Sequence, residues 1–132
     1  MADIMLMKAE ALSQLERYNE ALRIINRIRE RANVPAISLA NNRVAFEDAI
    51  LEERALELAY EGKRWFDLLR MGRRNDFGRK GKLIEIIVSN VPSTQKRILA
   101  AKLTNPSGWY LPVYDKEIER NRNLEQNPFY DF

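Results

Sequence analysis

Residues 55–74 read ALELAYEGKRWFDLLRMGRR, and this stretch decides how the middle of the chain is built. A helix-forming run reaches Glu61 and meets Gly62, which is followed by two basic residues and then by Trp65 and Phe66. The apolar spacing predicts one long helix over 43–72 that runs through the glycine. A glycine inside a helix costs about 1 kcal/mol relative to alanine. We therefore expect Gly62 to admit a neighbouring helix or a bend.

The aromatic pair after the glycine is expected to supply packing. Successive side chains point about 100° apart on a helix, so at least one of Trp65 and Phe66 can enter the core. We expect Trp65 to be structural, and the alternative is that it contacts a ligand. Arg64 and Asp67 stand three residues apart and are expected to pair across the aromatic patch.

Three carboxylates precede the glycine at spacings of four residues, at Glu53, Glu57 and Glu61. On a continuous helix they share one face, which is one arrangement that binds a divalent cation. No second Glu-x-x-His element is available to complete such a site. We expect neighbouring arginines, Arg54 and Arg64 among them, to neutralise the ladder, and we expect no metal and no cofactor.

The amino-acid composition of the chain excludes several kinds of functional site. The 132 residues contain no cysteine and no histidine, which excludes disulfides, thiolate metal sites and a Ser-His-Asp triad. An enzyme is therefore not expected. The net charge is +3, and residues 63–102 hold 11 basic and 3 acidic side chains. This segment is expected to be a solvated face, with nucleic-acid binding as an alternative.

The opening residues 1–35 predict a helical hairpin. Apolar residues follow helical spacing on both sides of RYNEA at 17–21, and Asn19 is the expected N-cap of the second helix. The pair has the length of a tetratricopeptide unit, about 34 residues. Residues 32–42 are expected to form a loop. We expect no signal peptide, because Asp3 and Glu10 stand where a basic and an apolar region belong.

Residues 73–132 are predicted to form a loop, a helix and an irregular, proline-punctuated tail. The charged run RMGRRNDFGRKGK at 70–82 reads as the loop, and LIEIIV at 83–88 fits a strand and a helix equally. A helix is expected over 92–104, a turn at 105–108 and one short helical turn near 115–120. The whole is expected to be a single all-α domain, 1–132, of tetratricopeptide-like hairpins.

Aromatic residues of the tail are the candidate ligand contacts. Sugar rings stack on exposed aromatic faces while their hydroxyl groups bind amides and charged groups. Trp109, Tyr110 and Tyr114 suit this role and stand near Asn105 and Asp115. The alternative is that the three rings pack the tail onto the helices.

Three blocks of the chain resemble the SusD/RagB family. ILEERALELAYEGKRWFDLLRMG resembles the family signature ER-x-x-EL-x-x-EG-x-R-W-F-DL, which falls on Glu53, Arg54, Glu57, Glu61, Gly62, Arg64, Trp65, Phe66 and Asp67. YLPVYDKEIERNRNLEQNPFY is similar to the family's closing segment, and the opening hairpin resembles its tetratricopeptide unit. The blocks stand in the family's order and cover about two-thirds of the chain; residues 73–104 match poorly.

The resemblance implies a binding protein and not an enzyme. SusD-like proteins are outer-membrane lipoproteins of Bacteroidetes that bind glycans or other nutrients over a TonB-dependent, SusC-like transporter. Family members are several times longer, so this chain is expected to be a C-terminal portion that serves mainly as helical scaffold. The alternatives are a free-standing tetratricopeptide-like interaction module and a basic nucleic-acid-binding domain; we expect no nucleic-acid partner.

The first helix is apolar on more than one side. Ile4, Met5, Leu6 and Met7 stand in a row, and Leu12 and Leu15 extend the pattern. The end unit of a repeat array normally has a polar outer face. We therefore expect an exposed apolar patch on this helix, which favours self-association.

Overall fold

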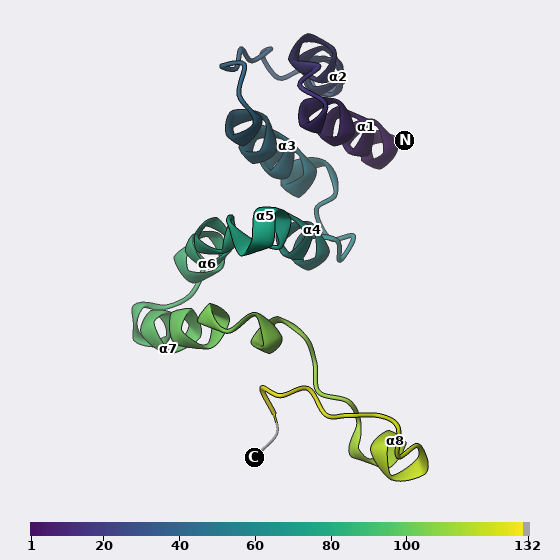
Figure 1. The fold of residues 1–132 in the computed structure, drawn as a ribbon. Coiled ribbons are helices and arrows are strands. Elements are labelled where there is room, and N and C mark those ends of the chain that lie inside the picture. The colour runs from purple at the N-terminus through teal and green to yellow at the C-terminus, as the bar shows by residue number, and fades with distance from the viewer. Residues whose placement is uncertain (131–132) are drawn as a thin grey trace. The chain divides into compact units, whose positions relative to one another are not determined.

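The computed structural model describes residues 1–130 and contains helices but no strand within that range (Figure 1). The all-α fold class predicted from the sequence is confirmed. The elements are α1 (Ala2–Gln14), α2 (Tyr18–Arg31), α3 (Arg43–Glu57), α4 (Arg64–Gly72), α5 (Arg74–Phe77), α6 (Lys80–Ser89), α7 (Ser93–Thr104), the 3-10 helix η1 (Pro106–Trp109) and α8 (Asp115–Arg120).

The chain divides into two compact units, Met1–Leu68 and Leu69–Phe132, the second being described as far as residue 130. Each unit has its own buried apolar residues, so each is described by itself. Folding of 1–132 as a single domain stays a prediction.

The first unit is a helical hairpin, α1 and α2, with α3 packed against it. Its core contains small residues where the helices come close and larger ones that fill the remaining space: Ala9, Leu12, Ala21, Ile25, Phe46 and Ile50. Alanines at the helix contacts allow a close approach, and burial of the branched side chains stabilises each by about 1.5–3 kcal/mol. The Tyr18 ring packs on Phe46, with ring centroids 5.1 Å apart.

The turn of the hairpin differs from the sequence expectation. Helix α2 begins at Tyr18, so Asn19 lies inside the helix and is not its N-cap; Arg17 occupies that position without a side-chain cap. Glu16 adopts a left-handed conformation, with φ of 60°. The Arg17 amide then donates to the Leu12 carbonyl oxygen at 2.9 Å. The C-terminal end of α1 is therefore closed by backbone groups.

Segment 32–42 is irregular, as predicted, and it is tied to α2. The Asn26 side chain donates to the Ile37 carbonyl oxygen at 3.0 Å and accepts from the Ile37 amide at 2.9 Å. At the end of the segment, Asn42 caps α3 by accepting from the Ala45 amide at 2.8 Å. The cap satisfies one of the free donors at the start of α3 and sets where that helix begins.

The long helix predicted over 43–72 is wrong. Helix α3 ends at Glu57, and α4 begins only at Arg64. Between them, Tyr60 and Gly62 both have left-handed backbone conformations, with φ of 67° and 71°. No heavy atom lies within 4 Å of the position that a Gly62 Cβ would take, so the glycine admits no neighbouring helix. It is needed for its backbone conformation.

In the second unit, the prediction of a loop at 70–82 is wrong. Helix α4 continues to Gly72, the short α5 follows, and α6 begins at Lys80. LIEIIV at 83–88, which fitted a strand or a helix, is helical. Inside α5, Asn75, Asp76 and Phe77 have φ of 50°, 52° and 62°. Three consecutive non-glycine residues in the left-handed region cost roughly 1–2 kcal/mol each, so the surrounding packing must hold this turn.

Trp109 organises the core of the second unit. It is 3% exposed, and its Nε1–H donates to the Leu103 carbonyl oxygen at 2.8 Å. A Cβ added at Gly72 would lie 2.8 Å from Leu83 and 3.2 Å from the Trp109 ring. Only a glycine therefore fits at position 72 without displacement of the buried Leu83 and Trp109 side chains.

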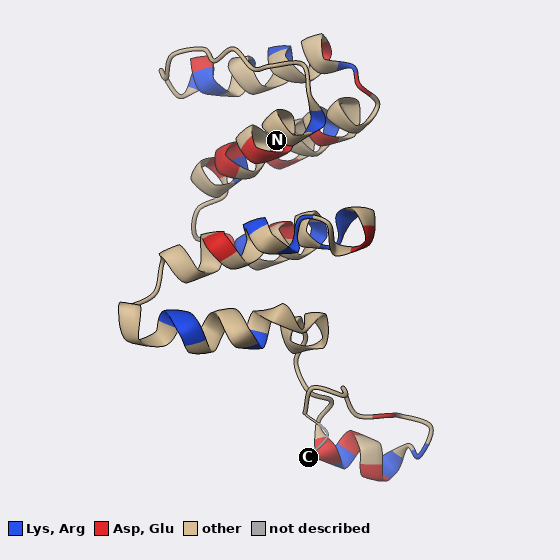
Figure 2. Cartoon of the chain, turned by 60° about the vertical axis from the view of Figure 1, so that its left-hand side comes forward, with Lys and Arg blue, Asp and Glu red and all other residues tan. Residues whose placement is uncertain are grey.

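The remaining elements agree with the sequence. Helix α7 starts directly after Pro92, η1 covers most of the predicted turn at 105–108, and α8 is the expected short helix. Figure 2 shows α7 carrying basic and no acidic residues. Within residues 1–130, no helix combines the length and the apolarity needed to cross a membrane.

Candidate functional site

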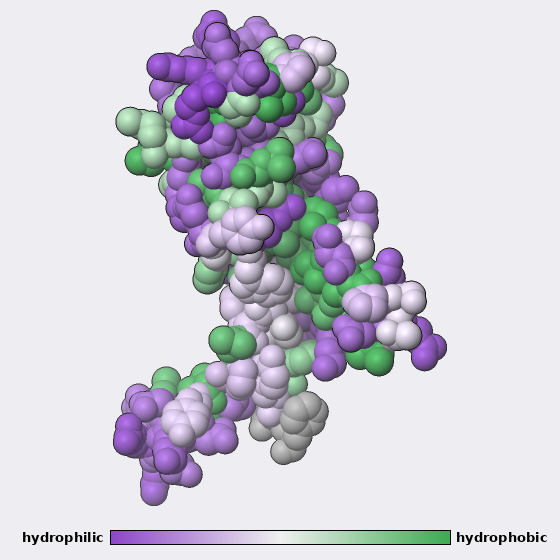
Figure 3. Space-filling model, turned by 180° about the vertical axis from the view of Figure 1, so that it is seen from behind, coloured by the Kyte–Doolittle hydropathy of each residue, from purple (hydrophilic) through white to green (hydrophobic). Residues whose placement is uncertain are grey.

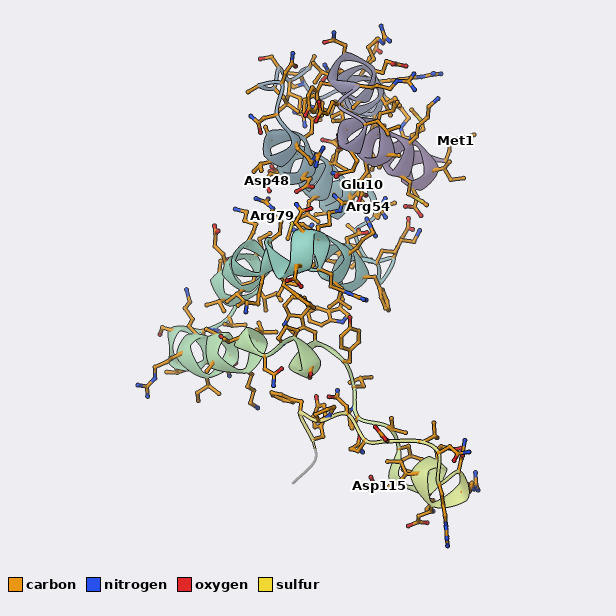
Figure 4. The ribbon with its side chains drawn as sticks, in the orientation of Figure 1. Met1, Glu10, Asp48, Arg54, Arg79 and Asp115 are labelled. Carbon is orange, nitrogen blue, oxygen red and sulfur yellow. The ribbon has the colours of Figure 1, made fainter. Side chains whose placement is uncertain are left out.

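The signature residues of 53–67 form an ion-pair network in the first unit. Arg54 projects from α3 and is buried (labelled in Figure 4). Its Nη2 lies 2.8 Å from Asp3 Oδ1 on α1, and its Nε lies 2.9 Å from Asp67 Oδ2 on α4. Burial is the largest influence on Arg54 and opposes its charge, but the hydrogen bonds and the negative charges of Asp67 and Asp3 together raise its pKa. One guanidinium therefore joins three helices.

The carboxylates at 53, 57 and 61 are paired with cations other than Arg54 and Arg64, which were expected from the sequence. Glu53 pairs with Arg29 of α2, with Nη1 and Oε2 2.9 Å apart, and Glu57 pairs with Arg31. Glu61 lies beyond the end of α3 and pairs with Lys63 at 2.9 Å. Arg54 and Arg64 do not serve this ladder. Within the described residues, no cluster of three or more acidic side chains has a metal-binding arrangement.

Arg64, the expected partner of Asp67, has a different role. Its Nη1 donates to the Leu51 carbonyl oxygen on α3 at 2.6 Å, and burial lowers its pKa. Asp67 is held by Arg54 instead. The first turn of α4 is therefore fastened to α3 by two arginines, one bound to a backbone carbonyl oxygen and one to a carboxylate.

The two aromatic residues of the signature do not enter the core. Trp65 is 37% exposed and Phe66 is 65% exposed. The prediction that at least one of the two rings enters the core is therefore wrong. The chain break at 58–63 explains the difference, because α4 has its own direction and presents both rings outward. The buried apolar residues of α4 are Leu68 and Met71.

The three aromatic ligand candidates occupy different environments. Trp109 is buried and lacks the exposed face that sugar stacking needs. Tyr110 is 42% exposed, and Tyr114, which directly precedes α8, is 63% exposed. Of the polar residues expected nearby, Asn105 accepts from the Ser107 amide at 3.0 Å, and Asp115 starts α8. Only Tyr110 and Tyr114 remain candidates for a stacking platform.

Tyr110 opens onto a cavity of the second unit, which we call the tail cavity. It has a volume of about 590 Å³, and its lining includes Arg73, Phe77, Tyr110, Glu125, Gln126 and Asn127. The Arg73 guanidinium carbon lies 6.0 Å from the Tyr110 ring centroid, within the range of a cation–π contact. The cavity thus combines an aromatic face, a guanidinium and a carboxylate.

Two amide side chains shape the wall of this cavity. Gln126 accepts from the Val113 amide and donates to the Val113 carbonyl oxygen, both at 2.9 Å. Asn127 Nδ2 donates to the Ser107 carbonyl oxygen at 2.9 Å. These bonds satisfy backbone groups of the irregular tail as a neighbouring strand would. Sequence reasoning missed both roles, although QNP stands in the segment that carries the family resemblance.

The left-handed turn at 75–77 supports the opposite wall. It places the Phe77 ring edge-on to Trp109, with centroids 5.5 Å apart, and Phe77 lines the tail cavity. Arg73, Phe77 and Glu125 were not predicted as site residues. No local pattern identifies them, because the turn and the tail that bring them together are 48 residues apart in the sequence, from 77 to 125.

Acid is expected to weaken the first unit through Asp3. A hydrogen bond from Lys63 is the main cause that lowers the Asp3 pKa; burial opposes it and Arg54 adds to it. Because the folded pKa is the lower one, this stabilisation is full above the unfolded value of about 4 and is lost as the pH falls through the folded pKa. Denaturant unfolding of the parent and of Asp3→Asn should therefore show a stability difference that shrinks below about pH 4. A difference independent of pH would contradict this.

Comparison with known proteins identifies the family to which the chain belongs. The sequence model of the SusD family matches residues 1–130. SusD-like protein P38 and SusD-like protein P2 of Formosa agariphila are 35% and 31% identical to it, each over 96% of this chain. The chain spans only 23% and 24% of the lengths of these relatives. No solved structure matches it. A match over all the described residues, with the three resembling blocks included, shows that the chain belongs to the SusD family.

Proposed function

We propose that the chain is part of a nutrient-binding protein of the SusD type, in which it acts mainly as helical scaffold. In this proposal the protein captures a glycan or another nutrient at the cell-surface face of the outer membrane. It delivers the ligand to a SusC-like, TonB-dependent transporter. Family membership over residues 1–130 supports this role, and binding without catalysis agrees with the absence of histidine and cysteine from the sequence.

The tail cavity is the place where we propose that this chain contacts the ligand. Tyr110 presents a half-exposed ring, and Arg73 and Glu125 stand on the lining of the same cavity. A pyranose ring that stacks on Tyr110 would have a guanidinium donor and a carboxylate acceptor for neighbouring hydroxyl groups, both of which form strong, charge-assisted hydrogen bonds. We therefore propose Tyr110 as the main ligand contact and Tyr114 as a second, outside the cavity.

Replacement of Tyr110 tests this proposal. Tyr110→Ala is expected to weaken glycan binding roughly tenfold, as loss of a central aromatic contact does at other binding sites. Titration calorimetry with a ligand found on a glycan array would measure it, with Tyr114→Ala expected to lose less. Circular dichroism checks the fold of both variants. Unchanged affinity in a folded Tyr110→Ala variant would remove the tail cavity as the ligand site.

We also propose that this chain associates with a second copy of itself through α1. The apolar residues of one stripe are buried, while those of the other reach the surface, where Figure 3 shows hydrophobic atoms near the N-terminus. The exposed ones are Met1, Ile4, Met7 and Leu15. In an antiparallel pair of α1 helices, Ile4 of one copy would oppose Leu15 of the other, with the small Ala11 near the middle.

Sedimentation velocity at micromolar concentration measures this association. Met7→Glu should shift the chain from dimer to monomer, because it places a charge in the middle of the apolar stripe. Ile98→Glu is the matched control, since Ile98 is exposed on α7 in the other unit. A parent chain that sediments as a monomer would overturn the proposal.

A further inference from the structure

A groove of about 1080 Å³ runs along α2 in the first unit, and we call it the α2 groove. One wall is α2 itself, with Asn19, Arg23 and Arg27 on it. The facing wall is the irregular segment after the helix, represented by Val34 and Pro35. The tail cavity belongs to the other unit, so this groove is independent of the proposed nutrient site.

The facing wall is held in place from α2. The Arg29 Nε donates to the Pro35 carbonyl oxygen at 2.9 Å, and the Val34 amide donates to the Arg29 carbonyl oxygen at 2.9 Å. The double hydrogen bond between Asn26 and Ile37 fixes the next residues. A groove with fixed walls loses little conformational entropy when it takes a ligand.

The two arginines on the helical wall have no direct acidic partner, although the charge of Arg23 contributes to lowering the pKa of Glu20. Among residues 1–130, neither Arg23 nor Arg27 has an ion pair or a side-chain hydrogen bond, whereas Arg29 and Arg31 of the same helix are paired. Glu20, the acidic residue nearest to Arg23 in sequence, is engaged by Arg17 through two hydrogen bonds.

Like charges four residues apart destabilise a helix, so an anion bound between Arg23 and Arg27 would offset their repulsion. Glu30 marks the other end of the groove and limits the anionic part of the ligand to the Arg23–Arg27 half.

The spacing of the two arginines selects the form of the occupant. Four residues of helix rise by about 6 Å, and alternate side chains of an extended chain are about 6.7 Å apart on one face. Carboxylates at alternate positions of an extended peptide would therefore face Arg23 and Arg27 in turn. The intervening side chains would point to the other wall, where Val34 and Pro35 are apolar. Among residues 1–130, no aromatic residue lines the groove, so this part of the chain offers no stacking platform for a sugar there.

We propose that the α2 groove binds an extended acidic peptide segment whose carboxylates occupy alternate positions. The probe is a fluorescein-labelled Asp-Val-Asp-Val-Asp peptide with blocked ends, measured by fluorescence anisotropy with the whole chain. A peptide of the same composition with its three aspartates adjacent tests the spacing, and Asn-Val-Asn-Val-Asn tests the charge. The alternating acidic peptide is expected to bind about tenfold more tightly than either control peptide.

Arg27→Gln is the deciding variant. It is expected to weaken binding of the alternating peptide about tenfold, and Arg23→Gln should act in the same direction. Lys96→Gln, which removes an exposed cation of α7, is the matched control and should leave the affinity unchanged. The proposal is overturned by absence of saturable binding up to about 1 mM peptide. It is overturned equally by an Arg27→Gln variant that binds as the parent does, and by an oligouronate that competes as well as the unlabelled peptide.

Discussion

Arg54→Met should lower the free energy of unfolding by about 3–5 kcal/mol, the cost of removing one partner from a buried ion pair. Methionine keeps most of the side-chain volume but removes the guanidinium that pairs with the carboxylate of Asp67, which is 3% exposed. Asp3 loses the same partner. Chemical denaturation followed by circular dichroism measures the difference between variant and parent.

Two further variants show whether the loss comes from the uncompensated charge. Arg17→Gln removes an arginine whose pair with Glu20 is exposed, and it should change the free energy of unfolding much less than Arg54→Met does. Arg54→Met combined with Asp67→Leu removes both buried charges and should be more stable than Arg54→Met alone. A double variant no more stable than Arg54→Met would show that the loss does not come from the charge of Asp67.

Trp109→Ala should destabilise the second unit by about 3–5 kcal/mol, the usual cost of truncating a buried tryptophan to alanine. It removes the ring that contacts Phe77 and fills the space beside Gly72, and it leaves the Leu103 carbonyl oxygen without its donor. The strained turn at 75–77 loses packing at the same time. Thermal melting followed by far-ultraviolet circular dichroism measures the effect.

Trp65→Ala is the natural control because it makes the same chemical change at an exposed position. Trp65 is already 37% exposed, so its truncation should cost clearly less than that of Trp109. The sequence alone placed Trp65 in the core and left Trp109 as either an exposed ligand contact or a ring that packs the tail onto the helices. Equal losses in the two variants would contradict the burial that the structure shows for these residues.

Helix positions were predictable where apolar periodicity is strong. The hairpin at 1–35, the start of α3 and the short α8 follow from spacing and punctuation in the sequence. The break between α3 and α4 does not, because ALELAY continues the helical pattern up to Gly62. Left-handed conformations at Tyr60 and Gly62 end the pattern, and the one at Tyr60 has no sequence signal.

The candidate site was only partly predictable for a related reason. Tyr110 and Tyr114 stand out by residue type, and both are exposed. Trp109 has the same type and the opposite environment, since its burial depends on Gly72 and Leu83 from other helices. The partners of the signature carboxylates were missed likewise, because Arg29 and Arg31 lie on α2, more than 20 residues upstream.

The hydrogen bond that the Asn127 side chain makes in the tail has a consequence for chemical ageing. Asparagine side chains deamidate when the backbone nitrogen of the next residue attacks the side-chain carbonyl carbon and a cyclic imide forms. Asn127 is followed by Pro128, whose nitrogen has no hydrogen to lose. The ordinary route is therefore closed at the residue whose Nδ2 bonds the Ser107 carbonyl oxygen. A conversion of Asn127 to aspartate would replace that donor by an acceptor. Because Pro128 follows it, Asn127 is protected from this slow deamidation.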